Sequence, residues 1–130
     1  MKDRIIGIDI GGTHLRMGAV DHAGQVTCFE KRESSEVCGS GGSARRLVAL
    51  IRDYLARNGL AERALAIAIG FPSTVSRNKR TVYNSPNLPI GGADGLDGQD
   101  VVALLETALG LPAFLDRDTI FLLQYDLVRL

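Results

Sequence analysis

A Gly-Gly pair at positions 11–12 joins two short apolar segments near the start of the chain. Residues 4–10 are rich in isoleucine, and residues 14–20 alternate apolar side chains with others. Such alternation is typical of a strand, and paired glycines suit a tight hairpin turn with positive φ. A second turn at 21–24 leads into a third strand-like segment at 25–31. The start of the chain therefore predicts a three-stranded antiparallel meander.

After this meander, helix-like and strand-like segments alternate. Apolar residues three and four positions apart predict an amphipathic helix over 44–58, with Ser43 as its N-cap and Gly59 as a left-handed cap residue. Residues 64–70 read as a buried strand parallel to the first one. The other expected elements are a short strand at 81–83, a helix at 99–109, a strand at 113–115 and a helix at 119–130.

This order, β-β-β-α-β-α-β-α, predicts an α/β fold. Three antiparallel strands followed by two right-handed crossovers give a mixed five-stranded sheet, three strands antiparallel and two parallel, flanked by helices. The same order is found in the ribonuclease-H-like lobes of actin-like ATPases. Order alone indicates a fold and not an activity.

Composition excludes several classes of protein. The 130 residues suffice for one domain, and 15 basic against 15 acidic residues give a net charge of +0. That balance argues against a nucleic-acid partner bound through bulk charge and against a membrane surface. We see neither a membrane span nor a signal-peptide cleavage region. Cys28 and Cys38 have no metal-site spacing, so we expect unpaired thiols and a cytoplasmic location.

The first candidate site surrounds the Gly-Gly turn. Asp9 ends the first strand and could hold Mg²⁺ through water, because hard cations prefer oxygen ligands. Gly11 and Gly12 would let backbone N–H groups approach an anion, Thr13 adds a hydroxyl, and His14 could face phosphates. The P-loop pattern is absent. An ordinary hairpin, with Asp9 bonding the turn backbone, explains the same residues.

Other candidates follow the two parallel strands. Asp118 could accept the proton of a substrate hydroxyl, although an Asp that opens a helix is also a common N-cap. Ser73 and Asn87 could bind hydroxyl groups of a polar ligand, or only satisfy turn backbone. Asp116 and Arg117 are close enough to pair with each other.

Four segments together resemble the ROK sugar kinases. Residues 6–16, IGIDIGGTHLR, are similar to the first phosphate motif of that family, and residues 69–72, IGFP, to a later strand and loop. Residues 85–89, SPNLP, resemble the segment before the sugar site, and residues 110–118, GLPAFLDRD, the strand that ends in the catalytic Asp. The resemblance covers nearly the whole chain, in order.

The resemblance implies ATP-dependent phosphorylation of a hexose hydroxyl, with Mg²⁺. Asp118 would be the catalytic base, and the sugar side would include Ser73, Asn87 and Arg117. Mg-ATP would be handled by Asp9, Gly11, Gly12, Thr13 and His14. Residues 70–81 and the Arg117-Asp118 pair look most similar to D-allose kinases, which implies the 6-hydroxyl of D-allose. Most relatives carry Asn where Arg117 stands.

The resemblance also implies that residues 1–130 are an N-terminal lobe. The family's second lobe carries further sugar, adenosine and phosphate motifs and a structural zinc site, none of which occurs here. We expect the isolated lobe to be inactive, and the apolar stripe of the last predicted helix to favour homo-oligomers.

Rival interpretations remain. They are another ROK hexokinase such as a glucokinase, the sugar sensor of a ROK repressor, and an actin-like assembly protein. Zero net charge and a first strand that follows Met1 within a few residues count against the repressor.

Overall fold

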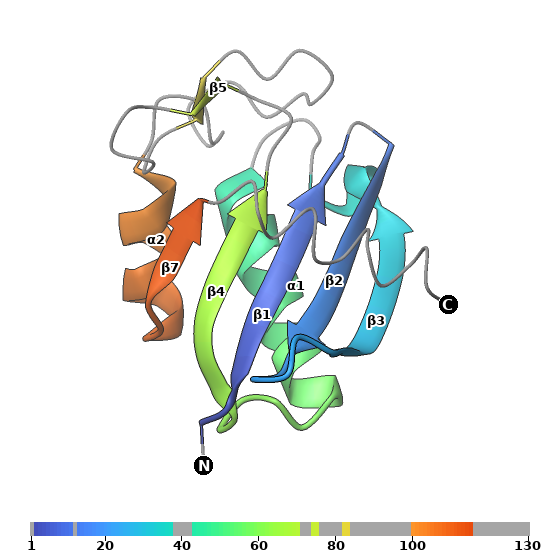
Figure 1. Ribbon diagram of the computed structural model, residues 1–130. Helices are drawn as coiled ribbons and strands as arrows, with labels where there is room; N and C mark the ends of the chain where they lie inside the picture. Colours follow the sequence, from blue (N-terminus) through green and yellow to red (C-terminus); the bar gives the residue numbers. More distant parts are fainter. Residues whose placement is uncertain are drawn as a thin grey trace.

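One five-stranded sheet carries the fold, and two helices cover one of its faces (Figure 1). The computed structural model describes residues 2–11, 13–37, 43–70, 74–75, 82–83 and 100–115. The sheet has the order β3-β2-β1-β4-β7. Its strands are β1 (Arg4–Ile10), β2 (His14–Val20), β3 (Val26–Glu33), β4 (Ala64–Gly70) and β7 (Ala113–Leu115). The helical elements are η1 (Ser34–Glu36), α1 (Ser43–Arg57) and α2 (Val101–Leu109).

Strand directions confirm the predicted mixed sheet. The pairs β1–β2 and β2–β3 are antiparallel, as the two predicted turns require. The pairs β1–β4 and β4–β7 are parallel, each reached through a helix. Because β1, β4 and β7 run in one direction, their carboxyl ends lie at the same edge of the sheet. In the described part of the chain, no helix is long and apolar enough to cross a membrane.

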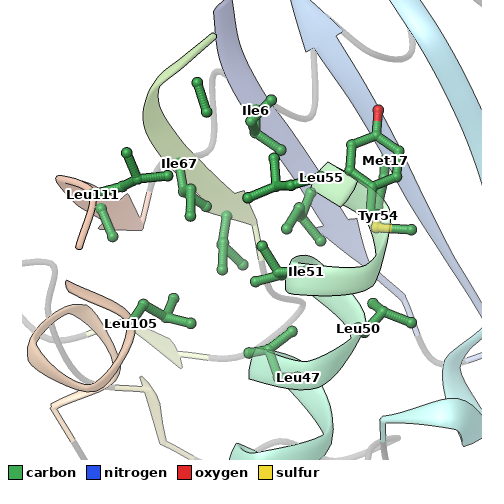
Figure 2. Close-up of a cluster of buried hydrophobic side chains, with 14 of the residues drawn as sticks. Ile6, Met17, Leu47, Leu50, Ile51, Tyr54, Leu55, Ile67, Leu105 and Leu111 are labelled. Atoms are coloured by element: carbon green, nitrogen blue, oxygen red, sulfur yellow. The ribbon is translucent and has the colours of Figure 1, made fainter. Parts of the chain in front are cut away.

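The core lies between α1, α2 and the sheet face that they cover (Figure 2). Alternate residues of β1, β2 and β4 point into it, while α1 contributes the stripe predicted from its periodicity. The α1 residues Leu47, Leu50, Ile51, Tyr54 and Leu55 are all at least 93% buried. They pack with Ile6, Ile8, Met17, Ile67 and Ile69 of the sheet and with Leu105 and Leu111. Helix spacing and strand alternation thus point to the same core.

Gly59, the predicted cap residue, follows α1, and Gly110 ends α2 in the same way. Gly59 and Gly110 have φ values of +65° and +69°, in the left-handed region that a side chain disfavours. The N-terminal limits differ from the prediction. Helix α1 already includes Ser43, the residue predicted as its cap, and α2 begins at Val101 because the Asp100 side chain accepts a hydrogen bond from the Ala103 N–H.

Two predicted strands also differ in extent. Strand β3 runs to Glu33 instead of residue 31, since its pairing with β2 continues to His14. The short strand β6 (Val82–Tyr83) pairs with β5 (Thr74–Val75) in a separate sheet that the sequence did not predict. The predicted helix at 119–130, with its apolar stripe, lies outside the described residues.

Tyr54 ties α1 to an irregularity in β3. The register of β2 and β3 shifts between Met17 and Ala19, and Cys28 there has a φ of +55°. The buried Tyr54 hydroxyl donates a 2.7 Å hydrogen bond to the Cys28 carbonyl. Burial raises the pKa of Tyr54, so the hydroxyl keeps its proton and remains a donor. The bulge and the helix therefore stabilise each other.

Replacing Tyr54 with Phe should destabilise the fold by about 1–2 kcal/mol, because the Cys28 carbonyl loses its donor while the ring remains. Thr27→Val is the matched control, since its bond to the Ala19 carbonyl is a long 3.3 Å and should matter less. Urea unfolding monitored by circular dichroism measures both. Equal stability of wild type and Tyr54→Phe would show that the bulge needs no donor.

Candidate functional site

The candidate site lies where β1, β4 and β7 end. The parallel register places Asp9 beside Gly70 and Ile69 beside Leu115, so the three chain segments leave the sheet next to one another. In Figure 1 the arrowheads of β1 and β4 point to this edge. In open α/β sheets, ligands bind outside the carboxyl ends of the strands. The topology therefore brings together the segments in which the sequence predicted site residues.

Asp9 is a buried carboxylate at this edge, with 8% of its surface exposed. Its neighbour across the β1–β2 pair is Arg16, whose Nη1 lies 3.9 Å from Asp9 Oδ2. Burial raises the pKa of Asp9 above its ordinary value, and Arg16 only partly opposes this. The long ion pair with Arg16 does not offset the free-energy cost of burying the Asp9 carboxylate. Such uncompensated buried charges are common at binding sites.

The β1–β2 turn is tight at Gly11. The Gly11 N–H donates a 2.9 Å hydrogen bond to the His14 carbonyl, and a Cβ on Gly11 would lie only 2.9 Å from the same oxygen. Gly11 does not have a positive φ, so the expectation of positive φ is wrong for it. Glycine is required here by close approach of backbone to backbone.

This bond also changes the expected set of anion donors. The Gly11 N–H is used inside the turn, so it is not available to a phosphate, contrary to the expectation for both glycines. Thr13 is exposed at the tip, and His14 is half-buried where β2 begins. Gly12 lies outside the described residues. An anion at this turn would therefore need donors other than the Gly11 N–H.

Ser34 contacts the same turn, although the sequence indicated only a polar loop around it. It is 2% exposed, and with Asp9 it makes up the buried polar residues of the described chain. Its Oγ donates a 2.6 Å bond to the Gly11 carbonyl, and its N–H donates a 2.9 Å bond to the Thr13 carbonyl. No local sequence signal marks this serine, since its side-chain partner is 23 residues away.

The remaining predicted residues lie outside the described part of the chain. They are Ser73, Asn87, Arg117 and Asp118. The strands that lead to two of them are described: β4 ends three residues before Ser73, and β7 ends three residues before Asp118. Their roles therefore remain predictions.

A magnesium ion held through water suits the donor set. The described residues contain no group of three or more His, Cys, Asp or Glu side chains that could hold a metal. Mg²⁺ commonly keeps several waters and is bound by one or two carboxylates together with substrate phosphates. The carboxylate of Asp9 beside the Gly11 turn fits that pattern. Cys28 is a free, exposed thiol, and Cys38 lies outside the described residues.

Comparison with known proteins identifies the relatives of this fold. The chain is 26% identical to a glucokinase of Streptomyces coelicolor over 113 residues, which are 87% of the chain and 32% of that enzyme. A ROK family glucokinase from Streptomyces griseus, solved with glucose and AMPPNP, is 25% identical with a TM-score of 0.67 over 88% of the chain and 33% of that structure. A ROK family transcriptional regulator, a homologue of the E. coli MLC protein, shares the fold at 21% identity, with a TM-score of 0.68 over 86% of the chain and 27% of that structure.

These likenesses confirm the predicted actin-like ATPase fold. The chain spans about a third of the length of the curated relative, 32%. The model of the ROK family matches residues 5–122, which is most of the chain and includes every candidate site residue. The chain therefore belongs to the ROK family.

Proposed function

We propose that this chain is the N-terminal lobe of an ATP-dependent sugar kinase. One observation carries the proposal: a ROK family chain places the buried Asp9 beside the Gly11 turn, where β1, β4 and β7 end together. Phosphoryl transfer needs anion donors, a metal and a positioned base. Two of these are assigned to residues 9–14, and the base follows β7. A second lobe would complete the site and exclude water from it.

The reaction assigns one role to each group. Asp118 takes the proton of the sugar hydroxyl, whose oxygen then forms a bond to the γ-phosphorus of ATP while the bond to the β-phosphate oxygen breaks. Asp9 would hold Mg²⁺ through water, and the ion would supply positive charge next to the phosphate oxygens. We assign the contacts with the phosphates to Gly12, Thr13 and His14. Ser73, Asn87 and Arg117 contact the sugar.

For the substrate we propose a hexose phosphorylated at its 6-hydroxyl, with D-allose first. The support is Arg117, a cation at the position next to the base where the family resemblance described above implies an amide. A longer, charged donor changes the hydrogen bonds available to the sugar ring. Glucose is the first competitor, since the relatives reported above include glucokinases.

The test is sugar-dependent ADP formation by the full-length gene product, whose intact mass is measured in the same preparation. With Mg-ATP and a panel of allose, glucose, mannose and N-acetylmannosamine, we expect one ADP per sugar phosphate and the highest kcat/KM for allose. A higher kcat/KM for glucose than for allose would make glucose the substrate. ADP formation that ignores every sugar would favour an assembly ATPase, and sugar binding without turnover would favour a sensor.

A further inference from the structure

Ser34 holds the two carbonyls on either side of position 12. Its Oγ donates to the Gly11 carbonyl at 2.6 Å, and its own N–H donates to the Thr13 carbonyl at 2.9 Å. Both distances are within the normal range for strong hydrogen bonds. One buried residue from the end of β3 thus fixes the backbone at both ends of the turn between β1 and β2.

The local structure explains how Ser34 reaches the turn. Pairing of β2 with β3 continues to the His14–Glu33 pair, and the chain then enters η1 (Ser34–Glu36). The Ser34 carbonyl accepts a 3.0 Å bond from the Val37 N–H, and Val37 is fully buried in the core. Ser34 is therefore held from the side of the core, and it has little freedom to leave the turn.

We propose that Ser34 is a positioning residue for the phosphate-binding turn, an inference that rests on the proposed kinase function. A backbone carbonyl is a hydrogen-bond acceptor, so it cannot bind a phosphate, which also needs donors. Because Ser34 holds the carbonyl oxygens of Gly11 and Thr13, neither oxygen is free to turn toward a bound anion. Loss of the Ser34 hydroxyl would release the Gly11 oxygen, and the turn would then bind a phosphate less well.

The test compares three variants of the full-length protein. Ser34→Ala removes the hydroxyl, and Ser34→Thr keeps it. Ser35→Ala changes the exposed neighbour, whose hydroxyl donates a long 3.4 Å hydrogen bond to the Glu33 carboxylate. For Ser34→Ala we expect KM and Kd for ATP to rise roughly tenfold, which corresponds to the loss of one average hydrogen bond from a binding equilibrium. KM for the sugar should stay unchanged, and Ser34→Thr should restore ATP affinity.

Each outcome decides between the proposals. If wild type phosphorylates a sugar and Ser34→Ala loses only thermal stability, with unchanged KM for ATP, Ser34 is structural and the positioning role is wrong. If wild type binds ATP but phosphorylates no sugar, the proposed function fails, and Kd for ATP in isothermal titration calorimetry still decides the role of Ser34. Absence of ATP binding in wild type overturns both.

Discussion

Asp118→Asn should lower kcat of the full-length kinase by a factor on the order of a hundred or more, because general bases commonly contribute that much to proton transfer. KM values for ATP and sugar should change little, since an amide has nearly the shape of the carboxylate. Coupled measurement of ADP at saturating substrates gives kcat directly. Turnover within a few-fold of wild type would remove Asp118 from the role of base.

Asp118→Asn also distinguishes a catalytic base from a residue that only caps the N-terminus of a helix. Asn is about as good an N-cap as Asp, so a residue that only caps a helix tolerates Asp118→Asn in both stability and activity. Asp118→Ala would instead cost about 1 kcal/mol of stability if the cap matters. Asp116→Asn, two residues earlier on the same segment, is the matched control and should leave kcat near the wild-type value.

The fold could be predicted from the sequence because local and global signals agree. The apolar stripe of residues 47–55 and the alternation in residues 14–20 each define one buried face, and the structure packs these two faces together. Glycines at 59 and 110 mark helix ends because left-handed backbone favours glycine. The bulge at Cys28 could not be predicted, since it depends on Tyr54, which is 26 residues away.

The candidate site could be predicted only in part, for the same reason. Asp9 and Gly11 stand in a recognisable local pattern, and the structure places both where β1 ends. The use of the Gly11 N–H by His14 and the burial of Ser34 against the turn arise from tertiary contacts. A sequence shows which groups are present near a site, whereas the donors already consumed by the fold require the structure.

Asp9→Asn should separate function from stability, because the two effects have opposite signs. Loss of the carboxylate should lower kcat/KM for Mg-ATP roughly 10–100-fold, the usual cost of removing a partner that holds a metal through water. Stability at neutral pH should rise, because burial disfavours the charged form of Asp9. The exposed part of Arg16, whose side chain is 29% exposed, can be solvated after its partner is lost.

The stability difference between wild type and Asp9→Asn should depend on pH in a known direction. Because the pKa of Asp9 is raised above 3.8 in the fold, wild type loses stability as pH rises through the interval between the ordinary and the raised pKa. The melting temperature of Asp9→Asn should therefore equal that of wild type in acid and exceed it above this interval.

Asp3→Asn is a control for which the pH dependence of stability should have the opposite sign. A hydrogen bond from Arg63 lowers the pKa of Asp3, so its contribution to stability is present above the ordinary pKa and is lost as pH falls. Asp3→Asn should therefore be less stable than wild type at neutral pH, with the difference closing in acid. If Asp9→Asn behaves like Asp3→Asn and keeps full activity, Asp9 stabilises the hairpin and does not serve the metal. If the two variants show opposite pH dependences of stability and Asp9→Asn also loses activity, the Asp9 carboxylate destabilises the fold but is needed to hold the metal.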